Sequence, residues 1–280
     1  MILSFHPCFT GDRQIFCAGR APDDNDLAAL RAADAVVLSQ GCSPALYSLA
    51  RENCRHVFPN YDLRFAYPGK SGQVRLFRRF GVPHPETEAY ADADEFAAAL
   101  GDGSSAVGRT YPFVFKFDWG GEGRNVLRIR SPEALASALK TARRYERTGQ
   151  KGFLVQEYVP SGNRVLRVTV VGERIITYWR VMPDAAAGAA GLAMGGRIDA
   201  SADPELQDLS AEAVREFCRA SGINLAGFDI LLREAAERCL PIFLEINYFF
   251  GRRGLGGSQA YYRMLITEIE RWIGSLDRRS

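Results

Sequence analysis

Histidine and paired cysteines are scarce in this chain, and their scarcity excludes several kinds of site. Its 280 residues include three histidines and six cysteines, with no C-x-x-C pair and no cysteine near a histidine at metal-site spacing. A Cys/His zinc site and a disulfide-stapled secreted domain are therefore not expected. The first residues lack the basic start and apolar run of a signal peptide, and no apolar run approaches the roughly 18 residues of a membrane-spanning helix. We expect a cytoplasmic protein with reduced thiols and no membrane partner.

A strong excess of either charge is also absent. Lysine and arginine together number 35 and the acids 33, a net charge of +2, so no field draws the whole molecule onto nucleic acid. An arginine-rich nucleic-acid binder is disfavoured because the acids match the arginines and no basic run exceeds two or three residues. Only four of the 35 cations are lysines, namely Lys70, Lys116, Lys140 and Lys151. A GC-rich genome explains this bias, yet each retained lysine is of interest.

Strand and helix patterns alternate along the chain and predict an α/β protein in three parts. Up to about residue 65, short apolar runs alternate with helical segments, which is typical of a small parallel sheet. Pro68-Gly69 then breaks the chain. The middle part has helical patterns at 70–80, 92–100 and 131–147 and strands at 111–117 and 126–129. The last part has strands at 152–159, 165–171, 174–181, 225–232 and 241–247, with helices at 203–222 and 261–273.

A glycine-rich loop follows the apolar strand that carries Lys116. The segment reads Phe-Val-Phe-Lys-Phe-Asp-Trp-Gly-Gly-Glu-Gly-Arg-Asn-Val from Phe113 to Val126. Glycine lets a backbone approach phosphate oxygens closely. Because a strand follows instead of a helix, a Walker loop and a dinucleotide fingerprint are both unlike this pattern. A buried ammonium is costly unless it meets an anion, so a phosphate partner for Lys116 is about as plausible as a lysine that extends past the strand end to water.

Three polar residues on two late strands predict a metal site. In the strand Pro241–Asn247, residues two apart share a face, so Glu245 and Asn247 point one way and Ile242, Leu244 and Ile246 the other. The preceding strand carries a single acid, Asp229, among apolar neighbours. If the two strands pair, three oxygen ligands converge, and Mg²⁺ is commonly held by a few carboxylates plus substrate phosphates. Pairing of each acid with an arginine is the alternative.

These segments, in this order, resemble the ATP-grasp ligases, most closely the RimK-like branch. The resemblance covers roughly residues 68–255 and rests on Lys70, the Lys116 strand with its glycine loop, the segment Gln156–Val159, Asp229 and the Glu245-x-Asn247 strand. It implies an α/β (α+β) ATP-grasp fold with a pre-ATP-grasp α/β domain at 1–67. The two subdomains that clasp ATP would span 68–151, which contains the glycine loop, and 152–280, which contains the metal site.

The resemblance also implies ligands for ATP and for Mg²⁺ or Mn²⁺. Nucleotide contacts would come from the two lysines, the glycine loop, the hinge at 156–159 and two residues beyond it: Lys70, Lys116, Gly120, Gly121, Gly123, Gln156, Glu157, Tyr158, Val159, Asn163 and Arg167. Metal would be held by Asp229, Glu245 and Asn247. Candidates for binding the acyl substrate or the transferred phosphoryl group are Arg180, Arg252 and Arg253. Loops 118–125 and 185–196 should be the most mobile internal segments without nucleotide, since they carry few large apolar side chains.

The implied activity is ATP-dependent joining of a carboxylate to an amine, or to a thiol, through an acylphosphate, with release of ADP and phosphate. Its partners would be a small carboxylic acid and an amine or peptide acceptor, and a homo-oligomer is one option for the assembly. The chain departs from the family pattern in lacking the usual ribose-binding acid near Val165 and the Arg-x-Asn before Gly195-Gly196. The alternative is therefore an ATP-binding regulatory protein without ligase turnover.

Overall fold

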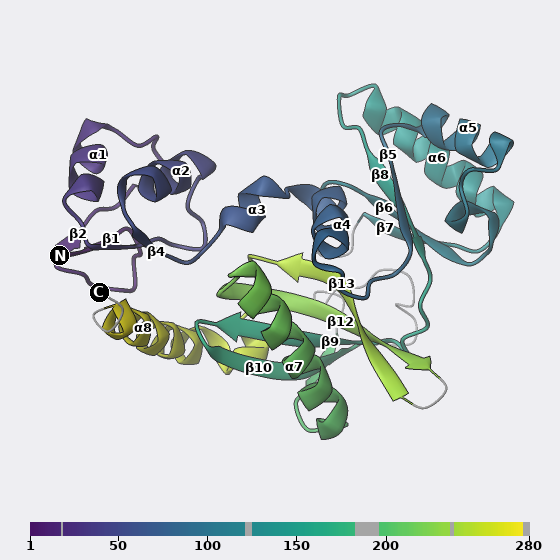
Figure 1. Ribbon diagram of the computed structural model, residues 1–280. Coiled ribbons are helices and arrows are strands. Elements are labelled where there is room, and N and C mark those ends of the chain that lie inside the picture. The colour runs from purple at the N-terminus through teal and green to yellow at the C-terminus, as the bar shows by residue number, and fades with distance from the viewer. Residues whose placement is uncertain (18, 121–124, 183–195, 236–237, 277–280) are drawn as a thin grey trace.

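The computed structural model describes the chain except residues 18, 121–124, 183–195, 236–237 and 277–280. The described residues form three sheets, each with its own helices (Figure 1). The predicted α/β class is confirmed. None of the described helices combines the length and apolar character needed to cross a bilayer. The two loops expected to be mobile overlap the omitted segments, so that expectation lies outside the described residues.

The first sheet is parallel and has the strand order β2-β1-β3-β4. Two of its helices begin at side-chain caps: Asp23 forms a capping box, and Ser43, just before a proline at the first helical position, accepts a hydrogen bond from the Leu46 amide. The unit comprises β1 (Ile2–Ser4), β2 (Arg13–Gln14), α1 (Asp24–Arg31), β3 (Ala35–Val37), α2 (Pro44–Asn53), β4 (His56–Phe58) and α3 (Asp62–Ala66).

The second sheet is antiparallel, in the order β5-β8-β6-β7. Phe113, Phe115 and Phe117 point from it into a core under two helices, so the intervening Val114 and Lys116 face the other way. Its elements are α4 (Gly69–Phe80), β5 (Thr87–Tyr90), α5 (Ala93–Asp102), a 3₁₀ turn η1 (Val107–Arg109), β6 (Phe113–Phe117), β7 (Val126–Ile129), α6 (Pro132–Glu146) and β8 (Phe153–Glu157). The expected boundary at 151/152 cuts this sheet, because β8 pairs with both β5 and β6.

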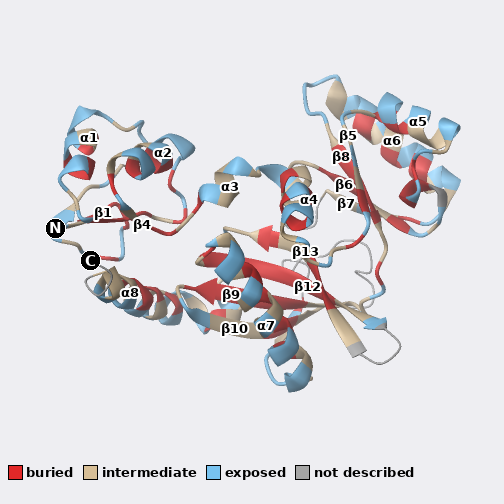
Figure 2. Ribbon diagram, viewed as in Figure 1, coloured by how far each residue is buried: buried red, intermediate tan, exposed pale blue. Residues whose placement is uncertain are grey.

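The third sheet is antiparallel, in the order β11-β10-β9-β12-β13. Phe217 of α7 and Phe77 of α4 pack on one face of it against Phe228 and Phe243. Its elements are β9 (Arg164–Val171), β10 (Arg174–Val181), β11 (Arg197–Asp199), α7 (Pro204–Ser221), β12 (Leu225–Ala235), β13 (Arg238–Asn247), a 3₁₀ turn η4 (Arg253–Leu255) and α8 (Gly257–Leu276). Figure 2 shows the buried strands of this sheet behind α7, whose outer side is exposed.

The predicted pairing of the strands at 225–232 and 241–247 is confirmed, but the predicted alternation on β13 is wrong. Asp229 lies opposite Glu245, and the next pair is Ile230 with Phe243, so one extra residue, Leu244, bulges out of β13. A bulge shifts the side-chain alternation by one. Ile242 and Leu244 accordingly pack on the same apolar cluster as Val159 and Leu231, whereas Ile246 packs with Phe243 in the core under α7.

Candidate functional site

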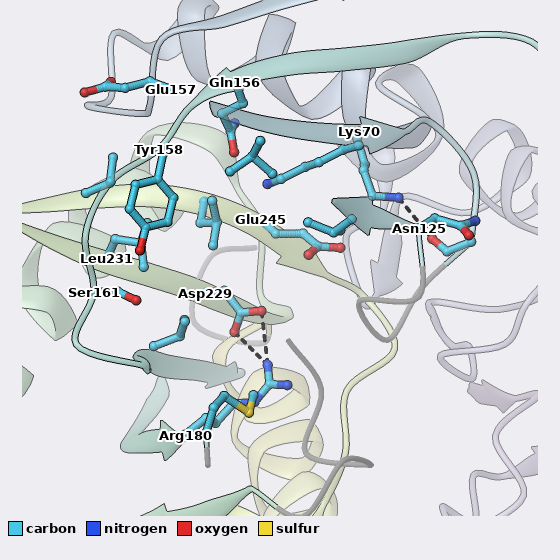
Figure 3. Close-up of a pocket in the computed structure, with 18 residues that line it drawn as sticks. Lys70, Asn125, Gln156, Glu157, Tyr158, Ser161, Arg180, Asp229, Leu231 and Glu245 are labelled. Carbon is cyan, nitrogen blue, oxygen red and sulfur yellow. Dashed lines mark hydrogen bonds and ion pairs between the residues drawn. The ribbon is translucent and has the colours of Figure 1, made fainter. Parts of the chain in front are cut away.

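One pocket opens between the second and third sheets, and both contribute to its walls. Its empty space, including the open mouth, is about 1000 Å³. Figure 3 shows Lys70 and Asn125 at one end, the hinge after β8 at another, and Asp229 and Glu245 on the opposite wall. The lining residues are Lys70, Val114, Lys116, Gly120, Asn125, Val126, Gln156, Glu157, Tyr158, Val159, Ser161, Val165, Arg180, Met182, Asp229, Leu231, Leu244 and Glu245.

Two lysines reach this pocket from different elements. Lys116 points off β6 on the face away from the phenylalanine core, and its side chain is buried. Burial, aided by the charge of Lys70 and opposed by Glu245 and Asp229, lowers the pKa of Lys116 to about 8. Lys70, in the first turn of α4, donates from Nζ to the carbonyl of Gly120 at 3.0 Å. Both lysines therefore line the pocket, where their ammonium groups can bind an anion.

The described part of the glycine loop is anchored by Asp118, which the sequence analysis did not single out. Its carboxylate accepts hydrogen bonds from the Ser71 amide at 2.9 Å and the Ser71 hydroxyl at 2.7 Å. Gly120 has a positive φ of 78°, and a Cβ there would lie 2.4 Å from Nδ2 of Asn125, so the turn requires glycine. Asn125 in turn donates to the carbonyl of Trp119 at 3.0 Å. The other two predicted loop glycines, Gly121 and Gly123, lie outside the described residues.

The predicted hinge residues all line the pocket, and long-range contacts fix them. Gln156 donates to the Thr87 hydroxyl at 2.8 Å. Glu157 turns outward, where it pairs with Arg233 at 2.6 Å. The guanidinium of Arg128 stacks over the ring of Tyr158, 3.7 Å from its centroid.

Beyond these polar contacts the pocket has an apolar floor. Val159, Leu231 and Ile242 are buried together there. Apolar walls with a few polar edges are typical of a site for a flat aromatic ligand such as a nucleobase.

Of the three predicted metal ligands, Asp229 and Glu245 line the pocket and Asn247 does not, although it contacts Asp229, which two arginines also contact. Asp229 and Glu245 are directly paired across β12 and β13, and Asn247 donates from Nδ2 to Oδ2 of Asp229 at 3.2 Å. Burial alone would raise the pKa of Asp229, but the guanidinium groups of Arg167 and Arg180 hold it below its ordinary value. The pKa of Glu245 is raised by burial and by the charge of Asp229, which outweigh the two lysines.

This donor set fits a hard divalent cation. Among the described residues, no hydrogen-bond donor contacts the half-buried Glu245 carboxylate, which lines the pocket (Figure 3), and a carboxylate partly removed from water without a partner is costly. Within the described part of the chain no three His, Cys, Asp or Glu residues gather as a metal cluster. The oxygen donors are thus two carboxylates and one amide, which suits Mg²⁺ or Mn²⁺ completed by substrate oxygens.

Several other predicted residues do not line the pocket. Asn163 adopts a left-handed backbone with φ 57°, and its carbonyl accepts from the Met182 amide at 2.7 Å. Arg167 is buried behind Asp229, which it contacts at 2.7 Å. Arg252 lies over the rings of Tyr261 and Tyr262, and Arg253 begins η4. Of the three predicted catalytic arginines, only Arg180 reaches the pocket.

Comparison with known proteins gives the class of fold. No protein-family model and no curated protein matches the sequence, but solved structures match it over nearly its full length. A RimK-domain ATP-grasp protein from Sphaerobacter thermophilus has a TM-score of 0.61 at 15% identity, covering 95% of this chain and 98% of that one. The fold is therefore the ATP-grasp fold, with RimK-like similarity, as the sequence resemblance implies.

Two further similar structures carry the names of enzymes. D-alanine–D-alanine ligase from Bacillus anthracis has a TM-score of 0.61 at 14% identity, covering 96% of this chain and 88% of that one. D-cycloserine synthetase DcsG has a TM-score of 0.60 at 19% identity, covering 96% and 98%. At such identities the likeness establishes the fold alone, and the activity must be argued from the site.

Proposed function

We propose that this protein is an ATP-dependent ligase that joins a carboxylate to an amine or a thiol and releases ADP and phosphate. The observation that carries the proposal is a pocket in which Lys70 and Lys116 stand opposite two paired acids, the buried Asp229 and the half-buried Glu245. A carboxylate that attacks a polyphosphate needs cations around the transferring group. Names of the similar structures, a ligase and a synthetase among them, agree with this reaction class.

Each wall of the pocket has a separate task in this proposal. The hinge at 156–159 and the apolar floor would hold the base. Ser161 lines the pocket and Asn163 does not, so Ser161 would contact the ribose in place of Asn163. Lys70 and Lys116 would bind the phosphates. Asp229, Glu245 and Asn247 would hold Mg²⁺ or Mn²⁺, which when bound neutralises charge on the transferring phosphoryl group. Closure of the two sheets around ATP would exclude water from the acylphosphate.

The substrate carboxylate attacks the γ-phosphorus in this scheme, and the bond to the ADP oxygen breaks. The resulting acylphosphate is then attacked by the amine or thiol, and phosphate leaves. Arg180 is the pocket arginine positioned to contact the transferred group. The acceptor is a small amine, a thiol or a peptide.

The test is a coupled ADP-release assay in which hydroxylamine replaces the unknown amine. Amino acids and dicarboxylic acids are screened, and an acyl hydroxamate should form with at least one of them. Glu245→Gln should abolish it, and Lys140→Met, at an exposed lysine on α6, should not. AMP and pyrophosphate as products would refute the ligase proposal. Tight ATP binding with no acid stimulating turnover would favour the regulatory alternative.

A further inference from the structure

Asp229, one of the proposed metal ligands, has no free acceptor position. Its Oδ1 accepts from Nε of Arg167 at 2.7 Å and from Nη1 of Arg180 at 3.2 Å. Its Oδ2 accepts from Nη2 of Arg167, Nη1 of Arg180 and Nδ2 of Asn247, each at 3.2 Å. A carboxylate offers about four lone-pair positions, and five contacts fill them. A cation can bind Asp229 only after one donor leaves.

The two arginines hold Asp229 unequally. Arg167 comes from the central strand β9, with 6% of its side chain exposed, and makes the shorter contact. Arg180 comes from β10, with 14% exposed, and both of its contacts are longer. Nε of Arg180 is buried without a hydrogen-bond partner among the described atoms. Arg180 lines the pocket and Arg167 does not.

Removal of Arg167 from the carboxylate would leave a buried guanidinium without a partner, which is expensive. Movement of Arg180 would carry its guanidinium into the pocket, where nucleotide phosphates are expected to lie. Figure 3 shows the Arg180 side chain rising to Asp229 from the wall below it, with Glu245 on the far side of the same space. Of the two arginines, Arg180 is therefore the one that can leave Asp229 at low cost.

We propose that Arg180 is a gate for the metal: it occupies Asp229 in the ligand-free protein and gives way when a divalent cation enters. This inference rests on the proposed function, because it takes Asp229 and Glu245 as metal ligands. Arg180 acts here as a positioning residue. The released guanidinium then faces the phosphates, so that metal loading and phosphate recognition are coupled through one side chain.

The experiment measures Mn²⁺ affinity of the nucleotide-free protein by the loss of the free-ion electron paramagnetic resonance signal. Arg180→Gln should bind Mn²⁺ about tenfold more tightly than the natural chain, because a desolvated charge pair no longer competes for the carboxylate. Arg174→Gln, which removes the same charge from an exposed position on the same strand, should leave the affinity unchanged. Adding Glu245→Gln to Arg180→Gln should remove the gain. Far-ultraviolet circular dichroism checks that each variant is folded.

Three results separate the gate from the proposed function. Equal or weaker Mn²⁺ binding by folded Arg180→Gln would overturn the gate and leave the ligase proposal standing. Absence of Mn²⁺ binding in every variant, with and without a non-hydrolysable ATP analogue, would overturn both. A crystal structure with Mn²⁺ on Asp229 in which Arg180 still contacts both carboxylate oxygens would also overturn the gate, whereas a separated guanidinium would support it.

Discussion

Replacement of Lys116 by methionine should stabilise the ligand-free protein while it removes nucleotide binding. Lys116 is 8% exposed, and burial lowers its pKa from 10.5 to about 8. Each pKa unit corresponds to about 1.4 kcal/mol, so keeping this ammonium in the fold costs about 3 kcal/mol at neutral pH. Removing the ammonium group recovers this cost, but part of the recovered free energy is lost because Glu245 no longer has the favourable charge of Lys116 beside it. We expect a net stabilisation of about 1–3 kcal/mol, or about 2–6 °C in melting temperature for a chain of this size.

The pH dependence has a definite sign. Between about pH 8 and 10.5 the unfolded chain keeps the Lys116 proton that the folded protein has lost, so the natural protein gains stability as pH rises through this window. The advantage of Lys116→Met should therefore be full at pH 7 and shrink toward pH 10. Thermal melts of both proteins at pH 7 and pH 9.5, without nucleotide, measure this difference.

Nucleotide reverses the order of the two proteins. Mg·ATP at a hundredfold excess over its dissociation constant should stabilise the natural protein by about 2.7 kcal/mol, and Lys116→Met should show little of that shift. Lys140→Met, at an exposed position on α6, should behave as the natural protein in both tests. If Lys116→Met is no more stable than the natural protein at pH 7, the assigned desolvation cost is wrong. If it keeps the full ATP shift, Lys116 does not bind phosphate.

Three further substitutions have distinct expected outcomes. Asp229→Asn should abolish turnover and also destabilise the fold by about 3–5 kcal/mol, because it leaves Arg167 buried without a charged partner. Glu245→Gln should abolish turnover without lowering the melting temperature, since it removes a half-buried charge whose pKa is raised. Gly254→Ala should cost about 1–3 kcal/mol in urea unfolding, because a Cβ there would lie 2.2 Å from Cζ of the buried Tyr178.

Controls decide each of these outcomes. If Asp229→Asn and Glu245→Gln are equally stable, the inferred difference between Asp229, whose carboxylate is filled by donors, and Glu245, whose carboxylate is open to the pocket, is wrong. Gly251→Ala is the matched control for Gly254, because a Cβ at Gly251 would meet no atom within 4 Å. If both alanine variants unfold alike, close packing of Tyr178 on the backbone is not what requires glycine at 254.

Local patterns in the sequence were sufficient for most of the fold. Ser131 followed by Pro132 predicts the start of α6, and the structure places the Ser131 hydroxyl on the Ala134 amide. The hairpin between β9 and β10 and the pairing of β12 with β13 also follow from alternation and turn residues. Such features depend on residues that are close together in the chain, so residue type and spacing are enough to predict them.

The details that sequence could not supply depend on contacts across the fold. The predicted side-chain alternation on β13 fails at Leu244, because the bulge there is not marked by any particular residue type in the sequence. The stacking of Arg128 on Tyr158 joins β7 to the residue that follows β8, on the far side of α6 in the chain. Arg252 and Arg180 are both arginines near predicted site segments, and only tertiary structure places Arg252 on aromatic rings and Arg180 on Asp229.

The packing of α8 has a consequence for the order in which the chain can fold. The core of the first sheet continues into this helix, where Tyr261, Leu265 and Ile269 are buried and Trp272 lies 5.5 Å from Phe58 between ring centroids. During synthesis the first sheet is made long before the helix that covers it. The apolar face of the first sheet therefore stays uncovered by α8 until the residues of both other sheets have been synthesised. During that interval the growing chain is most prone to aggregate and to bind chaperones.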